Sequence, residues 1–437
     1  MNTNTLIQRI AVLSTACIII LCATGATASA GGTFDVITVN SAITPPIARY
    51  IEKSIIDSYE SNAAGLILML DTPGGLDLAM RDIVKSILGS PIPIFVYVAP
   101  SGARAASAGV MITMAAHVAA MAPGTNIGAA HPVALGVGGT MDETMAKKVE
   151  NDAVAYAVSI AEKRKRNTKW VEDAVRKSAS VTAEEALSLK VIDMMAESVN
   201  ALLAQSHGKH IVLTDGEVTL DTKNALIHEK KMGIRDRILT TLSDPNIAYL
   251  LLLIGLAGLY FEFAHPGAVL PGVVGGISLI LAFFAMQTLP VNYAGVALII
   301  FAIILFIAEI KIISHGMLTV AGIISLILGS LMLFESPVPA LKVSFKVMIP
   351  TIVAISLFFI AVISLAVRAQ LRKPNTGMEA MDGKEGKAVT DIDAEGKVEI
   401  GGELWNASSS RPIAKGELVK VTGLKGLALV VEKIERR

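Results

Sequence analysis

Cysteine is almost absent from this chain, which has two cysteines among 437 residues. Both of them, Cys17 and Cys22, fall within residues 1–30. This segment has the form of a secretory signal peptide, with Arg9 before an apolar core and Ala28-Ser29-Ala30 as a cleavage pattern; an uncleaved membrane anchor is the alternative. Once the signal peptide is removed, no cysteine remains. A disulfide framework, a cysteine nucleophile and a thiolate metal site are therefore excluded.

Net charge is missing as well, because 38 Lys and Arg residues balance 38 Asp and Glu residues. The overall charge therefore gives no reason to expect a polyanionic partner such as nucleic acid. No cluster of His, Asp and Glu has the spacing of a metal site, and nothing implies a cofactor. Hydrophobic residues, in contrast, make up 53% of the sequence, although aromatic residues make up only 5%. Such a composition predicts a membrane segment.

Five long apolar runs lie in the second half of the chain, and each is long enough to span a bilayer. They cover about 246–263, 268–289, 293–310, 317–334 and 347–367. We expect an all-α transmembrane region of about five helices over residues 246–368. The second run is rich in Pro and Gly, so it either crosses the bilayer or forms a re-entrant segment. Glu262 and Glu309 lie near the ends of their runs, which argues against an ion pathway and disfavours a channel or transporter.

Residues 31–205 alternate between short apolar runs and amphipathic segments, the pattern of βαβ units around a mostly parallel sheet. Strands are expected at 34–39, 66–70, 94–98 and 118–121, and helices at 46–59 and 77–88. Three of these strands end in segments rich in Gly or Ala. The carboxyl ends of parallel strands meet at one edge of the sheet, so we expect these three segments to form a site there.

The three segments carry groups that acyl transfer requires. Ser107 follows the third strand at a strand-to-helix transition, where small neighbours and the amides of a helix N-terminus suit a nucleophile. Gly74 and Gly75 follow the second strand, where Gly74 shapes the turn and the N–H groups of Gly75 and Ala108 would form an oxyanion hole. The alternative for Ser107 is an incidental serine in a packing helix.

A general base for Ser107 is expected on the helix over residues 141–164. The apolar stripe of this helix consists of Met145, Val149, Ala153, Tyr156 and Ile160. Lys148 flanks the stripe whereas Lys147 points away from it, and a lysine that loses its proton near neutral pH needs desolvation. Lys148 is therefore the predicted base. The alternative is that both lysines are solvated.

His131 is the rival base, in a Ser/His/Asp set with Asp152 or Asp193 as the residue that orients it. His117 lies among alanines and is predicted to be a packed residue of the core. The basic run Lys163–Arg166 ends the Lys148 helix, where positive charge suits the helix dipole.

Several of these segments, in their order along the chain, resemble the membrane-bound NfeD branch of the ClpP-class serine proteases. They are Asp71-Thr72-Pro73-Gly74-Gly75, Ala106-Ser107-Ala108-Gly109, Pro123–Pro132 and Val181–Asp193. The resemblance implies a ClpP/crotonase-like α/β fold and a Ser–Lys dyad endopeptidase. It also places the dyad lysine directly before a Val-x-Asn-Asp run, which selects Lys148. The resemblance further implies a stomatin-like partner protein and a protease domain on the extracytoplasmic side.

Together these features predict an integral membrane endopeptidase and homo-oligomer that cleaves apolar, membrane-proximal segments. The loop residues Thr125, Asn126, Ile127, Gly128 and Ala129 are expected to line the bound substrate. Two functions of other classes stay open: a membrane scaffold that organises stomatin-like proteins with little protease activity, and a crotonase-like acyl transferase.

Residues 206–245 are expected to connect the protease domain to the membrane, with a β-hairpin around Asp215-Gly216. A polar linker at 369–383 precedes residues 384–437, where five short strands predict a small closed β-barrel, which the NfeD resemblance implies is OB-like. A translocated protease domain followed by five spans would place this barrel in the cytoplasm. Residues 375–437 contain ten Lys or Arg against eleven Asp or Glu, and Trp405 is their only aromatic residue. Single-stranded nucleic acid binders need a basic groove and stacking aromatics. We therefore expect the barrel to dock a protein.

Overall fold

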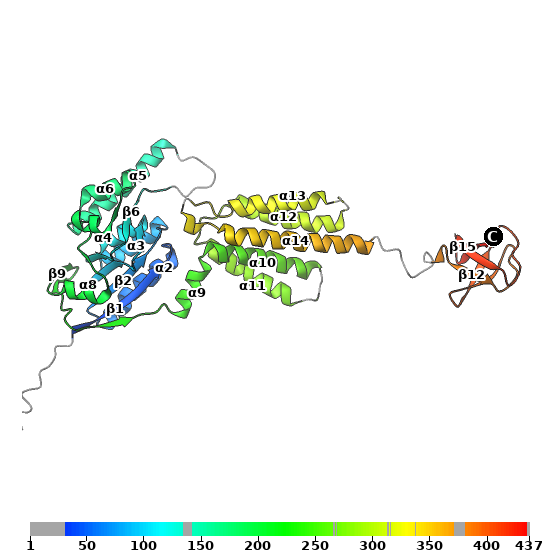
Figure 1. Cartoon of the computed structure of the whole chain (residues 1–437), viewed down its shortest axis with the longest axis horizontal. Helices are drawn as coiled ribbons and strands as arrows, with labels where there is room; N and C mark the ends of the chain where they lie inside the picture. Colours follow the sequence, from blue (N-terminus) through cyan, green and yellow to red (C-terminus); the bar gives the residue numbers. More distant parts are fainter. Residues whose placement is uncertain are drawn as a thin grey trace, which may run out of the picture. The chain divides into compact units, whose positions relative to one another are not determined.

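The computed structural model describes residues 31–133, 142–264, 267, 269–312, 314, 316–336, 338–370 and 381–434. Its contacts divide the chain into two units, one that ends at Ser356 and one that begins at Leu357. The predicted signal peptide lies outside the described residues, as does most of the predicted linker. The first unit holds an α/β domain followed by apolar helices, and the second unit holds a β-barrel (Figure 1).

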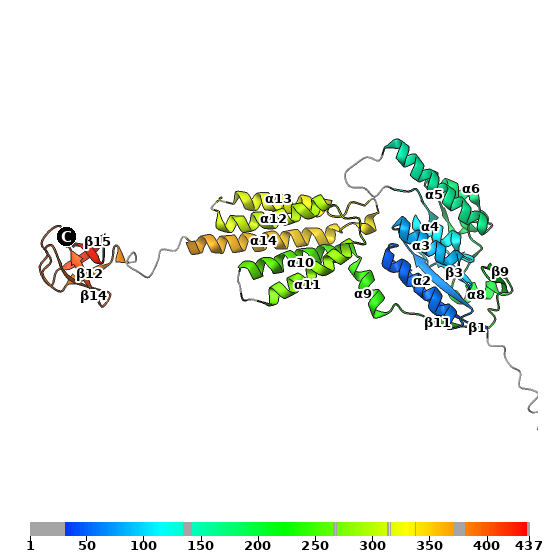
Figure 2. The ribbon, with the colours of Figure 1, turned by 180° about the vertical axis from the view of Figure 1, so that it is seen from behind.

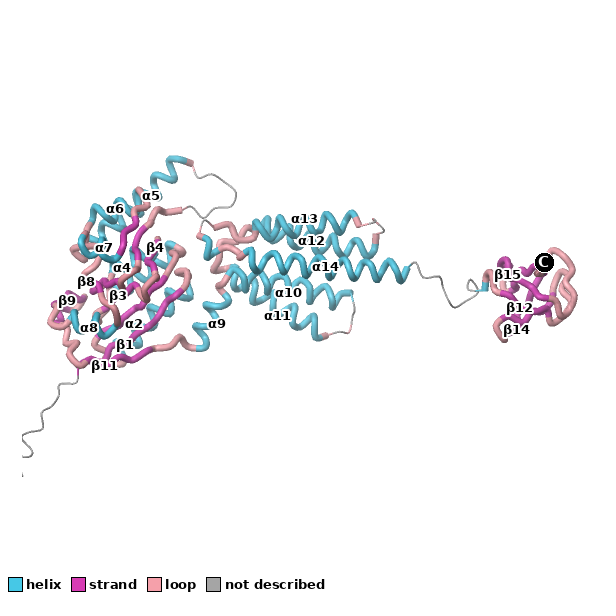
Figure 3. The backbone as a smooth tube through the Cα atoms, in the orientation of Figure 1, coloured by secondary structure: helices cyan, strands magenta, loops and turns pink. Residues whose placement is uncertain are grey.

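Six parallel strands form the central sheet of the α/β domain, in the order β11-β1-β2-β3-β5-β8 (Figure 3). They are β1 (Gly31–Asn40), β2 (Gly65–Asp71), β3 (Ile94–Val98), β5 (Val118–Met121), β8 (Met194–Met195) and β11 (Ala225–Glu229). The strands predicted at 34–39, 66–70, 94–98 and 118–121 are therefore confirmed. β11 corrects the predicted connector: residues 225–229 form the edge strand of this sheet, so the domain extends past residue 205.

Helices cover both faces of the sheet (Figure 2). They are α2 (Pro45–Glu60), α3 (Asp77–Leu88), α4 (Ala108–Ala115), α5 (Glu143–Lys163), α6 (Thr168–Arg176), α7 (Ala183–Ser188) and α8 (Val199–Ser206). Leu66 and Leu68 of β2 face one core with α2, α3 and α4, whereas Ile67 faces a second core with α8. Burial on both faces explains why these strands read as continuous apolar runs.

A second, smaller sheet lies beside the strand ends and consists of β4 (Arg104–Ala106), β6 (Asn126–Gly128) and β7 (Ser180–Thr182), in the order β4-β6-β7. After α8, β9 (His210–Leu213) and β10 (Gly216–Thr219) form the predicted hairpin. The helix α9 (Ile234–Leu242) then leads to the apolar helices.

Five apolar helices occupy the predicted transmembrane region (Figures 1 and 2). They are α10 (Pro245–Ala264), α11 (Leu270–Met286), α12 (Tyr293–Lys311), α13 (Met317–Met332) and α14 (Phe345–Gln370). By length and composition, two of them, at Pro245–Phe263 and Phe345–Leu365, can cross a membrane, and the other three are shorter. Small residues allow close packing: a Cβ added at Gly258 of α10 would lie 2.7 Å from Gly275 Cα of α11.

The second unit contains a closed five-stranded barrel, in the order β12-β13-β14-β16-β15. Its strands are β12 (Glu385–Ala388), β13 (Gly396–Ile400), β14 (Glu403–Ser408), β15 (Leu418–Lys425) and β16 (Ala428–Lys433). Alternate residues such as Val398, Val419 and Leu429 fill the interior. The predicted fold class is thus confirmed: an α/β domain, an all-α region and a small all-β barrel.

Candidate functional site

Ser107 occupies a strained turn between β4 and α4. Its backbone has φ 51° and ψ −111°, a conformation that costs a non-glycine residue about 1–3 kcal/mol. Ser107 is the residue directly before the first turn of α4, which is buried along its whole length. The Ser107 N–H donates to the carbonyls of Gly128 (3.3 Å) and Ala129 (3.1 Å). The turn therefore presents the Ser107 side chain at the amino end of a buried helix.

Gly74 packs directly against Ser107. A Cβ added at Gly74 would lie 2.7 Å from the Cβ of Ser107, and the φ of Gly74 is 111°. Its N–H already donates to Thr72 Oγ1 at 3.1 Å, so it is not an available oxyanion donor. The N–H of Ala108 belongs to the first turn of α4 and has no intrahelical acceptor. Gly74 thus packs in the turn against Ser107, and the oxyanion role of the Gly75 and Ala108 amides stays a prediction.

The predicted substrate loop supports Ser107 from behind instead of lining the pocket. β6 is hydrogen-bonded to β4 on one edge and to β7 on the other, so its backbone has no free edge for a substrate strand. Thr125 and Ile127 are buried, and Gly128 and Ala129 accept the Ser107 N–H. Within the described residues, the pocket wall begins after this loop, at Ala130. Within the described residues this loop does not line the pocket, and contact of Thr125, Asn126, Ile127, Gly128 and Ala129 with substrate stays a prediction.

A pocket of about 440 Å³ opens beside Ser107. Gly75, Ser107, Ala108, His131 and Lys148 all line it, although they are far apart in the sequence. The rival lysine is turned elsewhere: Lys147 Nζ forms an ion pair with Glu143 at 2.7 Å. The structure thus brings both predicted bases and the predicted nucleophile to one pocket, and it separates Lys148 from Lys147.

The helix that carries Lys148 is less buried than its apolar stripe predicts. The buried residues of α5 are Val154, Ala157, Ile160 and Ala161, all in its second half. Met145 is 50% exposed and Val149 is 38% exposed, and Lys148 beside them is also exposed. The predicted desolvation of Lys148 is therefore absent from the free chain, because the first half of α5 projects beyond the core (Figure 1).

Arg81 of α3 connects the two sides of the pocket. Its Nε donates to Asp77 at 2.8 Å, and its second amino group donates to Asp152 of α5 at 2.6 Å. Its guanidinium also lies 4.4 Å from the ring centre of Tyr156. Burial opposes the charge, but the two carboxylates outweigh it and raise the pKa of Arg81. Arg81 therefore links α3 to α5 at Asp152, which lies one helical turn after Lys148.

His131 is exposed at the pocket rim, and its Nδ1 lies 2.9 Å from the carbonyl of Val175. If Nδ1 of His131 carries the proton and donates it to this carbonyl, Nε2 is the ring nitrogen that can accept a proton. Neither predicted orienting carboxylate is available, since Asp152 pairs with Arg81 and Asp193 pairs with Arg166. A triad with Asp152 or Asp193 is therefore not assembled here, although His131 itself is at the pocket.

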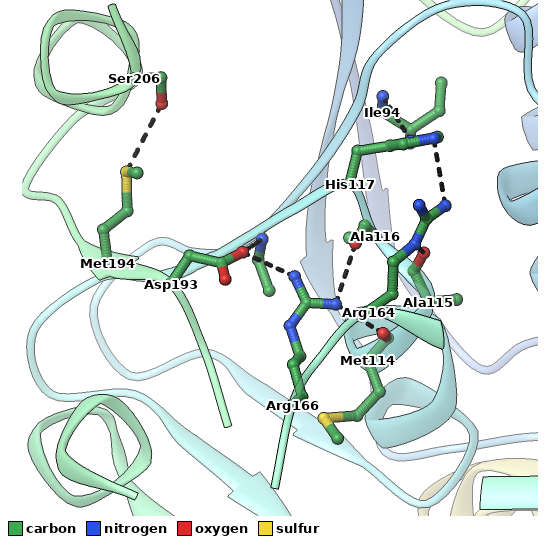
Figure 4. A network of polar contacts seen from close by, with 11 residues as sticks. Ile94, Met114, Ala115, Ala116, His117, Arg164, Arg166, Asp193, Met194 and Ser206 are labelled. Carbon is green, nitrogen blue, oxygen red and sulfur yellow. Dashed lines mark hydrogen bonds and ion pairs between the residues drawn. The ribbon is translucent and has the colours of Figure 1, made fainter. Parts of the chain in front are cut away.

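The far end of α4 is capped by Arg164 and Arg166 (Figure 4). The Arg166 guanidinium is 2% exposed and donates to the carbonyls of Met114 (2.6 Å) and Ala116 (2.9 Å) and to Asp193 (2.6 Å). Arg164 Nε donates to the carbonyl of Ala115 at 2.8 Å. These carbonyls lie at the C-terminal end of α4, where positive charge is favourable. The basic run therefore caps the helix of Ser107 rather than only its own helix.

His117 belongs to the same network. Its Nδ1 accepts the N–H of Ile94 at 3.2 Å, and its Nε2 lies 3.1 Å from Arg164. Burial, with the positive charges of Arg164 and Arg166, lowers the pKa of His117 to about 3. His117 is therefore a neutral, buried residue, as predicted.

Sequence reasoning missed Arg81 and the capping role of Arg166. The i,i+4 spacing of Asp77 and Arg81 was visible, but the partner Asp152 lies 71 residues away. The basic run at residues 163–166 was also visible, and only the fold shows which helix it caps.

Three family models match successive parts of the chain. They are the NfeD1b N-terminal domain at residues 33–215, the NfeD integral membrane domain at 246–365, and the NfeD-like C-terminal, partner-binding domain at 378–433. A curated relative, the membrane-bound protease PH1510 of Pyrococcus horikoshii, is 38% identical over 405 residues, which covers 90% of this chain and 91% of the relative. The chain belongs to the NfeD family.

Other relatives agree with this NfeD assignment. The membrane protein NfeD1b of Bacillus subtilis is 28% identical over 432 residues, covering 91% of this chain and 92% of the relative. Among solved structures, the 1510-N membrane protease specific for a stomatin homolog, from Pyrococcus horikoshii, is 33% identical, with a TM-score of 0.43 over 49% of this chain and 99% of that one. The family models and the curated relatives confirm the family resemblance, and the chain is a membrane protein with an NfeD integral membrane domain.

Proposed function

We propose that this protein is a membrane-bound serine endopeptidase that acts through Ser107 and Lys148. The observation that carries the proposal is the strained Ser107 turn at the amino end of α4, in a pocket that Lys148 also lines. A strained turn that exposes a serine beside free helix amides is the arrangement that acyl transfer needs. A relative that is 38% identical and is described as a membrane-bound protease supports the same reaction class.

In the proposed reaction, the Oγ of Ser107 attacks the peptide carbonyl while neutral Lys148 takes the hydroxyl proton. The N–H groups of Gly75 and Ala108 stabilise the oxyanion. Lys148 then gives the proton to the leaving amine, and water hydrolyses the acyl-enzyme. Within the described residues no hydrogen bond joins Ser107 and Lys148, and such contacts often tighten only in the complex with substrate. No residue of this mechanism calls for a cofactor.

We further propose that the substrates are apolar, membrane-proximal segments of a stomatin-like protein. Small and apolar side chains line much of the pocket, including Met80, Ala108 and Met111, and such a wall favours apolar residues. The solved relative is described as specific for a stomatin homolog. The family model of the barrel is described as partner-binding, which supports docking of the same partner there. An extracytoplasmic protease domain, a cytoplasmic barrel and a homo-oligomer remain parts of this proposal.

A fluorophosphonate probe tests the proposal on the full-length protein in detergent. We expect stoichiometric labelling of Ser107 and none in Ser107→Ala. Absence of labelling in the folded wild-type protein would favour the alternative, a scaffold that organises stomatin-like proteins.

Peptide cleavage then separates the two candidate bases. Lys148→Ala should reduce cleavage by about 10²–10⁴-fold, and His131→Ala should retain much of the activity. The reverse pattern would replace the dyad by a histidine-based mechanism.

A further inference from the structure

The helix α9 has an apolar face that the protein leaves uncovered. Ile234 is 80% exposed and Ile238, one turn later, is 54% exposed, and α9 contains no buried residue. At about 100° per residue, these two side chains lie only about 40° apart on the helix surface. Arg235 and Arg237 lie on the two flanks of this face, and both are exposed. An apolar stripe bordered by arginines is the pattern of a helix that lies in a membrane surface.

The opposite side of α9 packs against the α/β domain, so the apolar face of α9 points away from that domain. Leu239, Asp236 and, at its edge, Arg235 line a groove with Lys53 of α2. Asp236 lies close enough to Tyr50 to help burial raise the pKa of that hydroxyl. The chain before α9 is also held in place. Lys230 Nζ pairs with buried Asp35 at 2.7 Å, and the Lys230 carbonyl accepts the hydroxyl of Tyr50 at 3.3 Å.

The position of α9 along the chain identifies what covers its free face. Only Ser243 and Asp244 separate α9 from α10, the first helix of the integral membrane domain. Polar contacts gather the helix ends at this level: Ser243 Oγ accepts the hydroxyl of Thr288 at 3.1 Å, and Asn246 Oδ1 accepts the N–H of Ser344 at 2.8 Å. The C-terminal end of α9 therefore lies level with the ends of the apolar helices α10, α11 and α14.

We propose that α9 is an interfacial helix whose occupant is the phospholipid bilayer itself. Ile234 and Ile238 enter the edge of the hydrocarbon layer, while Arg235 and Arg237 bind headgroup phosphates on either side. The contact holds the α/β domain against the membrane independently of whether the domain is a protease.

Site-directed spin labelling tests this arrangement in the full-length protein. The only two natural cysteines, removed by Cys17→Ser and Cys22→Ser, leave a background in which Ile238→Cys carries a nitroxide. Two matched labels serve as references: Val212→Cys, at an exposed apolar residue of β9, and Ile280→Cys, at an exposed apolar residue of α11. The protein is reconstituted in vesicles of phosphatidylcholine and phosphatidylglycerol. The readout is the ratio of collision rates with oxygen, which enters lipid, and with a nickel chelate, which stays in water.

We expect the oxygen-to-nickel ratio at 238 to exceed that at 212 severalfold and to approach that at 280. A ratio equal to that at 212 would show an aqueous helix and overturn the proposal. Low collision rates with both reagents would also overturn it, because they would mean that a second copy or a partner protein covers the face.

The arginines are tested in the same labelled background. Arg235→Gln with Arg237→Gln should lower the ratio at 238, whereas Lys85→Gln with Lys190→Gln, which removes the same charge from exposed sites elsewhere, should not. Equal ratios in the two double variants would overturn the role assigned to the arginines.

Discussion

The two sides of the Ser107 pocket are built in opposite ways. On one side, Ser107 is held by backbone hydrogen bonds, by the close approach of Gly74 and by a buried helix that Arg166 caps at its far end. On the other side, Lys148 extends from the exposed half of α5, which the Arg81–Asp152 ion pair links to α3. One side is complete in the free chain and the other is not.

This difference separates two requirements of the proposed serine–lysine mechanism. The proposed nucleophile, Ser107, and the proposed oxyanion donors need fixed geometry, which the buried side supplies before substrate arrives. A neutral lysine needs desolvation, which the exposed side lacks. We infer that a bound apolar segment covers Met145 and Val149 and thereby removes water from around the Lys148 amine. Perturbing the two sides separately should then have different effects.

The largest effect is expected from Gly74→Ala, which disrupts the complete side. The new Cβ would meet Ser107 at 2.7 Å, at a φ that alanine strongly disfavours, so we expect probe labelling and cleavage to be lost. Gly208→Ala is the matched control, because Gly208 also has positive φ but nothing within 4 Å. Retained activity in Gly74→Ala would mean that the turn tolerates displacement.

Lys148→Ala should reduce kcat/KM for peptide cleavage by about 10²–10⁴-fold, the usual contribution of a general base. Its unfolding midpoint should be unchanged, since Lys148 is exposed. Lys147→Ala, which removes a neighbouring charge paired with Glu143, should leave the rate near that of the wild type. Similar losses in both variants would point to helix charge instead of proton transfer.

Arg166→Met should destabilise the α/β domain by about 3 kcal/mol, because it breaks a buried ion pair and uncaps α4. Denaturant unfolding of the full-length protein measures this loss. Arg176→Met removes an exposed arginine with two carboxylate partners and should change stability little. Equal effects would contradict the view that α4 is fixed from its far end.

The buried side should also weaken in acid through His117. The unfolded chain takes up a proton below its ordinary pKa near 6.5, while the folded pKa is about 3, so stability falls as pH drops from about 6.5 towards 3. The expected loss at pH 5 is about 2 kcal/mol. His117→Gln should flatten this part of the stability profile, measured by unfolding across pH. An unchanged profile would assign the acid sensitivity to other groups.

The smallest effect is expected from Arg81→Gln, which loosens the link between the sides. Lys148 would remain but would be positioned less well, so we expect a loss of less than about tenfold in kcat, with folding retained. Asp152→Asn should give a similar result. A loss as large as that of Lys148→Ala would mean that Arg81 itself contacts the substrate.

Much of the architecture could be predicted because local patterns agree with the final fold. The apolar strands, the hairpin at Asp215-Gly216 and the five barrel strands each carry their own periodicity or turn chemistry, and the structure contains them all. The apolar stripe on α5 predicted burial of its first half, which the structure leaves exposed. Periodicity shows which residues could be buried, but not whether another element packs against them. β11 was missed because a strand at a sheet edge, exposed along most of its length, lacks a strong apolar signal.

Reading the residues alone identifies the kinds of groups available: a serine among small residues, a glycine pair, adjacent lysines, no cysteine after residue 30 and many apolar residues. Which of these groups meet depends on the folded chain. Folding brings Lys148 and not Lys147 to the Ser107 pocket, pairs Asp152 and Asp193 with arginines, and joins the Thr125–Ala129 loop to the Ser107 N–H through backbone hydrogen bonds. The physical reason is that spacing along one helix or strand is local, whereas burial and charge pairing depend on residues that only the folded chain brings within contact.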